Sequence, residues 1–371
     1  MLSSRERMIR ALCLEEPDRV PMWALVIDNP IPQAITGKST ALTREAFEND
    51  LKVLEETHKK LGLDAMTLYP ALYSGQEVKY VNERDYLDMW GAIWRGGPFP
   101  TLCGMMHVDG TIKTLEDLEK FHPPDPEDTI EAVKEVERTL RKICGDMLLI
   151  PAVCGGFEIG LEMRKGGLAN FLSDFYLNPR IPEKIMDMVH KYNMKVLSAM
   201  VDFGAEAVLL DEDFADNKGP MISPQLWRKF VKPQIKDFID RFKRRGVFTL
   251  MHICANVTPV LDDLLDMGLD GLHPIEDLNI PQMDIGKIKE EYGDRLCLIG
   301  NVDCSEILVS GTEEEVRQAV RTCIEKASSG GGHVLCESNS LHWYVSPKNA
   351  VTMYDEGKKY GRYPTRHQPV R

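Results

Sequence analysis

A histidine and a cysteine in the second half of the chain stand at a spacing that suits metal binding. His252 and Cys254 close a short apolar run, and residues i and i+2 of an extended chain project to the same side, so both side chains can reach one ion. Cys336 ends a second apolar run and could supply another thiolate. A Cys₂His set with an open fourth position suits a catalytic Zn²⁺. We therefore predict a zinc site at His252, Cys254 and Cys336.

Polar side chains follow several of the other apolar runs. An acidic residue at such a place could serve as a general acid, as a fourth ligand or as a partner that orients His252. We predict catalytic roles for Asp213, Glu158 and Glu276, and substrate contacts for Tyr69, Asp211 and Asn301. The sequence also leaves open a plainer interpretation, in which the acids cap helices or face solvent and Tyr69 and Asn301 fill core or turn positions.

These residues need a scaffold that brings distant strand ends together. Eight short β-type runs alternate with helical stretches, which is typical of a parallel α/β architecture. Eight strands can close a (β/α)₈ TIM barrel, in which active sites lie at the C-terminal ends of the strands. The predicted strands are Val20–Leu25, Asp64–Leu68, Leu148–Val153, Ala207–Leu210, Val247–His252, Asp270–Pro274, Leu296–Gly300 and His333–Cys336.

The helical stretches between the runs carry apolar residues at three-and-four spacing. They are predicted at Arg44–Leu61, Thr129–Ile143, Pro182–Asp202, Pro224–Arg245 and Glu313–Ala327. Ser223 is the predicted N-cap of the helix Pro224–Arg245, and Pro233 can kink this helix.

The stretch from about residue 77 to 126 departs from the alternation and is rich in glycine, proline and aromatic residues, among them Trp90, Trp94 and the run Gly96–Pro98. We interpret it as an insertion between strands 2 and 3 of one domain that spans residues 1–371. It could cap the barrel mouth, line a substrate pocket or be a plain surface excursion.

The composition fits a globular protein and argues against several partners. Hydrophobic residues make up 43% of the 371 residues, and the formal net charge is −13, so a nucleic-acid partner is not expected. The chain shows no apolar run long enough for a membrane span and no secretory signal at its beginning, so we expect a cytoplasmic protein without a membrane partner. The odd number of cysteines, nine, favours reduced thiols that are free to bind metal.

Several segments together resemble one known family. Met251–Leu261 reads MHICANVTPVL and looks like the zinc motif of the cobamide (corrinoid)-dependent methyltransferases of the uroporphyrinogen decarboxylase superfamily. The resemblance covers most of the chain, and its other segments are Glu15–Pro21, Ser223–Trp227 with Phe230 and Pro233, Ile299–Asp303, Ser338–Ser340 and Tyr360–Pro364. It implies a zinc-dependent methyltransferase on a TIM barrel.

The chain departs from the family pattern at two places near the metal motif. Ala255 replaces the usual glycine, and Val334–Ser338 stands where the thiol-methylating members carry Pro-Gly-Cys-Gly. The arginine-rich block with which the true decarboxylases grip porphyrinogen carboxylates is also missing, since Trp23–Pro30 contains no arginine, and Leu68–Leu72 lacks their catalytic aspartate. We therefore do not expect decarboxylation.

The leading hypothesis is O-demethylation: a small methoxylated, aromatic substrate gives its methyl group to the corrinoid of a partner protein. The altered context of Cys336 and the aromatic insertion favour this direction. The corrinoid should arrive on a separate protein, because the barrel uses nearly the whole chain. Two alternatives stay open: methylcobamide:thiol methyltransfer of the coenzyme M type, and a non-catalytic corrinoid- or metal-binding accessory protein. A homodimer is one assembly that the sequence permits.

Overall fold

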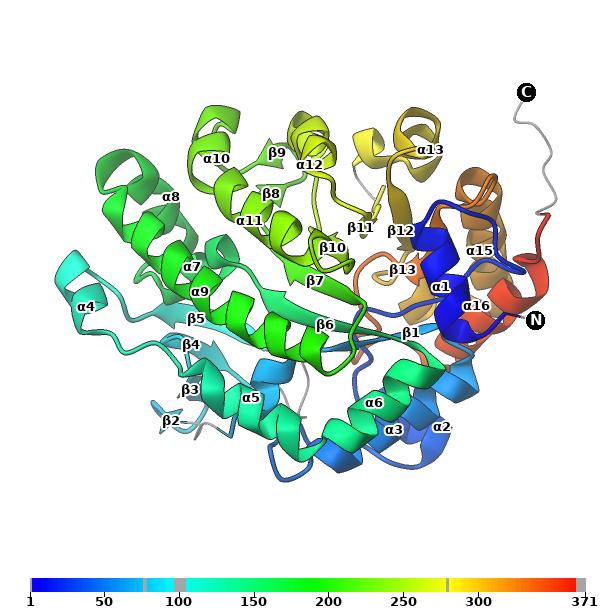
Figure 1. Cartoon of the computed structure of the whole chain (residues 1–371), viewed down its shortest axis with the longest axis horizontal. Helices are drawn as coiled ribbons and strands as arrows, with labels where there is room; N and C mark the ends of the chain where they lie inside the picture. Colours follow the sequence, from blue (N-terminus) through cyan, green and yellow to red (C-terminus); the bar gives the residue numbers. More distant parts are fainter. Residues whose placement is uncertain (1, 76–78, 97–104, 278–279, 365–371) are drawn as a thin grey trace.

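Seven parallel strands form one curved sheet at the centre of the molecule. The computed structural model describes residues 2–75, 79–96, 105–277 and 280–364. Neighbouring strands follow the order β1-β6-β7-β10-β11-β12-β13, with helices between them in the sequence (Figure 1). Their bounds are β1 Ala65–Leu68, β6 Leu148–Cys154, β7 Ala207–Asp211, β10 Phe248–His252, β11 Gly271–His273, β12 Cys297–Val302 and β13 His333–Glu337. The α/β TIM-barrel prediction is confirmed, and each of these strands lies within two residues of its predicted bounds.

The segment 20–27 occupies the eighth position, between β13 and β1. Met22 bridges to Leu335 on β13, and the Met22 carbonyl accepts a hydrogen bond of 2.7 Å from the N–H of Asp64, just before β1. Pro21 has no N–H to donate to β13. The N–H of Leu25 donates to the Glu337 carboxylate at 3.0 Å instead of to a backbone carbonyl. The predicted strand Val20–Leu25 therefore closes the barrel through bridges and side chains instead of a regular ladder.

The barrel interior is filled by alternate side chains of these strands, as expected for a parallel barrel. They form one buried cluster with two further segments, namely Met8, Ala11 and Leu12 of the helix at residues 4–12 and Trp23, Leu25 and Val26 of the segment 20–27. The strand residues of the cluster are Ala65, Leu148, Ile150, Ala152, Ala207, Leu209, Leu250, Cys297, Ile299, Val334 and Cys336. The residue two positions beyond an interior residue faces the same side of the strand and lies at the barrel mouth. Asp211 follows Leu209, His252 follows Leu250 and Cys154 follows Ala152 in this way.

Helices surround the strands, with α3, α5 and α6 on one side and α10 to α12 on the other (Figure 1). Their bounds are α1 Ser4–Leu12, α2 Pro30–Thr36, α3 Phe47–Leu61, α4 Leu115–Lys120, α5 Pro126–Glu135, α6 Glu137–Asp146, α7 Gly156–Met163, α8 Gly167–Leu177, α9 Arg180–Asp202, α10 Pro224–Phe230, α11 Lys232–Lys243, α12 Leu261–Met267, α13 Ile285–Tyr292, α14 Ile307–Ser310, α15 Glu313–Ala327 and α16 Pro347–Tyr360. None of the helices in the described ranges combines the length and the apolar character needed to cross a membrane.

Two of the predicted helices are interrupted. The helix predicted at Thr129–Ile143 is divided at Val136 into α5 and α6. The helix predicted at Pro224–Arg245 begins at the Ser223 cap as expected, with the Leu226 N–H donating to the Ser223 hydroxyl at 3.3 Å. It then breaks at Val231, so that Pro233 lies in the first turn of α11, where its missing N–H costs no helical hydrogen bond.

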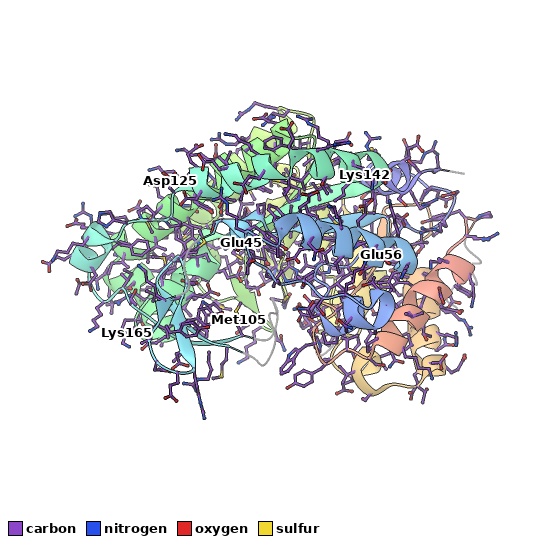
Figure 2. The ribbon with its side chains drawn as sticks, turned by 90° about the horizontal axis from the view of Figure 1, so that it is seen from below. Glu45, Glu56, Met105, Asp125, Lys142 and Lys165 are labelled. Atoms are coloured by element: carbon purple, nitrogen blue, oxygen red, sulfur yellow. The ribbon has the colours of Figure 1, made fainter. Side chains whose placement is uncertain are left out.

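The insertion forms a second, smaller sheet beside the barrel. Its antiparallel strands, in the order β2-β3-β4-β5, are β2 Lys79–Tyr80, β3 Asp85–Leu87, β4 Ala92–Arg95 and β5 Met106–Gly110. Ile112 bridges to Arg164 just after α7, and Lys165 pairs with Asp109. Met105 and Lys165 lie on the same side of the molecule, away from Glu56 on α3 (Figure 2). The insertion therefore packs against α7, the helix that follows β6. Part of the predicted insertion, residues 77–78 and 97–104, falls outside the described ranges.

Candidate metal and proton-transfer site

The strand register brings four polar side chains into one row at the barrel mouth. Asp211 on β7 is in register with Cys154 on β6 and with His252 on β10. His252 is in register with His273 on β11. Residues paired across parallel strands point to the same side of the sheet. The alternation that fills the barrel interior with apolar side chains thus ends in a layer of thiol, carboxylate and imidazole groups.

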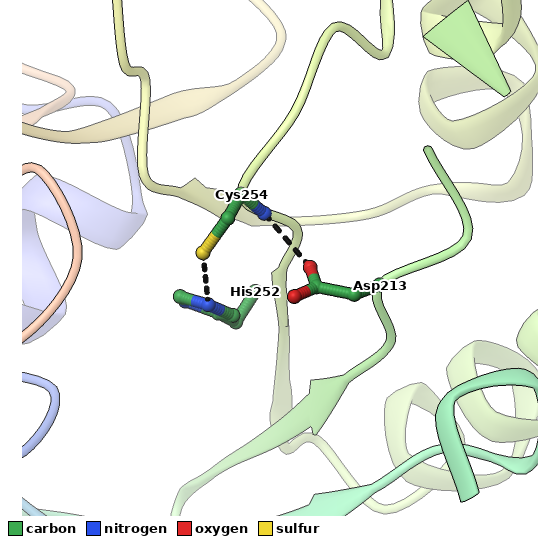
Figure 3. Close-up of side chains that lie close together, drawn as sticks. All are labelled: Asp213, His252 and Cys254. Carbon is green, nitrogen blue, oxygen red and sulfur yellow. Dashed lines mark hydrogen bonds between the residues drawn. The ribbon is translucent and has the colours of Figure 1, made fainter. Parts of the chain in front are cut away.

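His252, Cys254 and Asp213 form a compact group of potential ligands. One ligand atom from each of them lies within 4.8 Å of the others. The Cys254 Sγ is 2.7 Å from His252 Nε2, and the Cys254 backbone N–H donates to Asp213 Oδ1 at 2.9 Å (Figure 3). Burial and the nearby carboxylates of Asp213 and Asp211 raise the pKa of the Cys254 thiol well above its usual value. A bound cation would offset this cost, because metal ligation favours the thiolate.

Cys336, predicted as the third ligand, lies outside this group. Its side chain is fully buried in the barrel interior, and its Sγ is 3.3 Å from His273 Nε2. His273 in turn faces His252, with 2.7 Å between the two Nδ1 atoms. Cys336 is thus connected to His252 through the His273 ring, and whether it ligates a metal directly stays a prediction.

Asn339 contacts the cysteine of the metal group directly. Its side-chain amide donates to the Cys254 Sγ at 2.8 Å, while its amide oxygen accepts from Ser340 at 2.9 Å. Sequence reasoning quoted Asn339 only as part of a resembling segment and assigned it no role. A signal was present, since Asn339 follows the end of β13 by two residues, where barrel residues face the mouth.

A second group of potential ligands adjoins the first. Ligand atoms of Cys154, Glu158 and Asp211 lie within 4.8 Å of one another. Asp211 also faces the first group, with 3.8 Å between its Oδ1 and His252 Nε2, and its Oδ2 accepts a hydrogen bond of 2.9 Å from the Tyr69 hydroxyl. Tyr69 and Asp211, which follow or end strands, therefore meet Glu158 from the first turn of α7 at the mouth.

The carboxylates at the mouth repel one another. Burial, followed by Asp211 and Asp213, raises the pKa of Glu158 well above its usual value. Burial and the charges of Asp88, Asp211 and Asp213 raise the pKa of Glu162 to about 8. Within the described ranges no lysine or arginine forms an ion pair with Asp211, Asp213, Glu158 or Glu162. The mouth is therefore a concentration of negative charge that protons or cations must neutralise.

The other predicted residues lie farther from this centre. Glu276 is half-buried, and burial together with Asp303 and Asp277 raises its pKa. Asn301 is in register with Cys336 and its side chain bonds to Asp277. The partner of His252 Nδ1 is His273, and no hydrogen bond joins Glu158 or Glu276 to that ring. The sequence predicts Glu158 or Glu276 as the partner that orients His252, whereas in the structure His273 faces the Nδ1 atom of His252.

The donor set fits a zinc ion better than a hard cation. Imidazole nitrogen, thiolate sulfur and carboxylate oxygen are all zinc ligands, whereas Mg²⁺ and Ca²⁺ prefer oxygen alone. His252, Cys254 and Asp213 would leave a fourth position for substrate or water. These features define the class of the molecule, a (β/α)₈ barrel with a candidate metal site at its strand ends.

The chain belongs to the uroporphyrinogen decarboxylase (URO-D) family, whose model matches residues 101–360. It is similar to the uroporphyrinogen decarboxylase of Aeromonas salmonicida (strain A449), with 23% identity. It is also similar to the uroporphyrinogen decarboxylase of Vibrio vulnificus (strain YJ016), with 25% identity. Each of these two matches covers 93% of this chain and 94% of the relative. Among solved structures it is similar to a methyltransferase from Methanosarcina mazei, with a TM-score of 0.72, 19% identity, and coverage of 97% of this chain and 99% of that one. The last likeness shows that the two share a fold.

Proposed function

We propose that this protein is a zinc-dependent methyltransferase that moves a methyl group from a methoxylated, aromatic substrate to the corrinoid of a partner protein. The observation that carries the proposal is the convergence of His252, Cys254 and Asp213 at the end of β10. The shared fold with a protein named as a methyltransferase supports it. His252, Cys254 and Asp213 would hold the zinc ion, which when bound supplies Lewis-acid polarisation of the ether oxygen.

The transfer requires that one proton reach the leaving oxygen. The bond between the methyl carbon and the ether oxygen breaks, the methyl group passes to the corrinoid, and the oxygen keeps the electron pair. Glu162 is suited to give the proton, because its pKa of about 8 keeps it protonated at neutral pH. It lies one turn after Glu158 on α7, so both side chains share one face of that helix. Sequence reasoning singled out Glu158 and did not single out Glu162.

Tyr69 and Asp211 would line the substrate side of the site. The Tyr69 hydroxyl fixes one Asp211 oxygen. Tyr69 also borders a cavity of about 40 Å³ between the segment 24–28, β1 and α3. The cavity wall includes the apolar side chains of Leu25, Leu42 and Leu72. An aromatic ring held against such a wall would keep water away from the leaving oxygen.

The charge of the mouth argues against the reaction for which the sequence relatives are named. A uroporphyrinogen carries several carboxylates, and Asp211, Asp213 and Glu158 would repel them. The first segment of the barrel offers no arginine to grip them, since Trp23, Ala24 and Leu25 are buried there. A neutral ether meets no such repulsion.

The experiment is a demethylation assay with zinc-loaded protein, a reduced corrinoid protein and a panel of methoxyarenes. The expected result is one phenol released per methyl group transferred, and no product from His252→Ala protein. If no phenol appears from any donor, methylcobalamin with candidate thiols tests the coenzyme M type of transfer. Absence of turnover in both assays, with zinc still bound, would support a non-catalytic binding protein instead.

A further inference from the structure

The second ligand group, Cys154, Glu158 and Asp211, depends on a close approach of α7 to the end of β6. Cys154 ends β6, and Gly155 and Gly156 let α7 begin at once. A Cβ on Gly155 would lie 1.6 Å from a Glu212 oxygen, and a Cβ on Gly156 would lie 2.7 Å from the backbone of Met186. A side chain at Gly156 would meet backbone and one at Gly155 would displace the Glu212 carboxylate, so the two glycines let the first turn of α7 lie directly over the strand end. This geometry brings Glu158 back toward Cys154 and Asp211.

One carboxylate oxygen of Glu158 has no hydrogen-bond partner among the described residues. Its Oε2 is buried and has no hydrogen-bond partner. The neighbouring Glu212 is similar: one oxygen accepts from the Phe157 N–H at 3.0 Å, and the other is buried without a partner. Buried carboxylate oxygens are costly unless a donor or a cation compensates them. The described residues supply neither, so the group lacks a positive charge at its centre.

We propose that Cys154, Glu158 and Asp211 bind a second divalent cation beside the one at His252 and Cys254. A thiolate with two carboxylates favours a borderline metal such as Zn²⁺ or Fe²⁺ over Mg²⁺ or Ca²⁺. Asp211 lies between the two groups, 3.8 Å from His252 Nε2, and a carboxylate can bridge two metals about 3.5–4 Å apart. The Tyr69 hydroxyl would steady the bridging carboxylate.

A second cation would give the two glutamates of α7 different roles. With Glu158 engaged as a ligand, Glu162 would be the carboxyl that holds a transferable proton. The inference goes beyond the proposed methyl transfer and does not depend on it, because it concerns metal binding by residues outside the first group.

The test is the metal content of the full chain. Protein freed of metal with a chelator is equilibrated with Zn²⁺, desalted and analysed by elemental mass spectrometry. We expect two equivalents per chain for wild type and one for Cys154→Ser and Glu158→Gln, with the folded state checked by circular dichroism. Matched controls are Glu162→Gln, on the same face of α7, and Cys304→Ser, a buried cysteine outside both groups. Both controls should keep two equivalents.

Cobalt substitution gives an independent readout. Thiolate-to-Co²⁺ charge-transfer absorption should remain in Cys254→Ser protein, where Cys154 is the thiolate left in the two groups, and should disappear when Cys154→Ser is added. One equivalent in wild type, or two equivalents retained in both Cys154→Ser and Glu158→Gln, would overturn the proposal. Failure of the demethylation assay would leave these metal counts unchanged, so the two ideas fail separately.

Discussion

The two histidines at the barrel mouth, His252 and His273, face each other through their Nδ1 atoms at 2.7 Å. Burial lowers the pKa of His273 well below its usual value, so its ring is neutral and only one of its nitrogens carries hydrogen. His273 Nε2 faces the Cys336 sulfur and is the natural donor there. Its Nδ1 then accepts from His252 Nδ1–H, which leaves His252 Nε2 as a lone pair beside Cys254. The pair thus fixes the tautomer that metal binding requires.

Replacing His273 with glutamine should weaken zinc binding without removing a ligand. The His252 ring would lose the acceptor that holds its tautomer, and loss of a residue that orients a metal ligand typically costs about 10–100-fold in affinity. Competition with a fluorescent zinc chelator measures the change. His58→Gln is the control, because His58 is equally buried but bonds to the Leu54 carbonyl in α3. Equal affinity for His273→Gln and wild type would contradict the orienting role.

Cys336→Ser separates two roles for that residue. If Cys336 acts through His273, the serine hydroxyl still accepts from the His273 ring, and zinc affinity should fall by no more than about tenfold. If Cys336 is itself a ligand, the protein should lose the tight site altogether. Stoichiometry and affinity measured together by calorimetry distinguish these outcomes, and we expect the first.

The strand ends could be predicted from the sequence because each is an apolar run that ends in a polar residue. This pattern singles out His252, Cys254, Asp211 and Tyr69, and the barrel topology brings their strand ends together. His273 lies one residue before the end of the predicted strand Asp270–Pro274, and its pairing with His252 depends on the strand register, which the sequence alone does not reveal.

The carboxyl groups of α7 were harder to predict. The raised pKa of Glu162 comes first from burial and then from the charges of Asp88, Asp211 and Asp213, which tertiary packing brings near α7. The position of Cys336 was also hard to predict. Near the end of β13, a difference of one or two residues decides whether a side chain reaches the mouth or lies in the buried core.

Asn339→Ala should make zinc binding more dependent on pH. The Asn339 amide donates to the Cys254 sulfur, and a hydrogen bond to a charged group contributes about 1.5–3 kcal/mol. Its loss disfavours the thiolate, so the pH of half-maximal metal binding should rise by about one unit or more. The thiolate charge-transfer band of Co²⁺-loaded protein, followed during a pH titration, measures this shift. Asn170→Ala, an exposed position in the first turn of α8, should titrate like wild type.

Glu212 should make the metal-free protein less stable as the pH rises. Burial raises the pKa of Glu212 to about 8 from its ordinary 4.5. Between these values the folded state binds more protons than the unfolded state, so the free energy of unfolding falls with increasing pH. One such group contributes at most about 1.4 kcal/mol per pH unit. Urea unfolding of chelator-treated protein across this window should show a shallower decline for Glu212→Gln.

The comparison variant for this measurement is Glu48→Gln. Glu48 lies on the surface of α3, and its hydrogen bond with Lys52 lowers its pKa, so its substitution should leave the decline above pH 5 unchanged. A decline of the same slope in Glu212→Gln and wild type would show that Glu212 does not hold the proton.

Glu162→Gln should slow demethylation in a manner that depends on the leaving group. Loss of a general acid typically costs about 10²–10⁴-fold in rate. A nitro-substituted methoxyarene releases a more acidic phenol that needs less help from a proton, so the variant should be impaired far less on this substrate than on an electron-rich one. Single-turnover rates on both substrates provide the comparison, and zinc content verifies that the site is intact. Equal impairment on the two substrates would assign Glu162 to substrate binding instead of proton transfer, because a binding defect does not sense the acidity of the product.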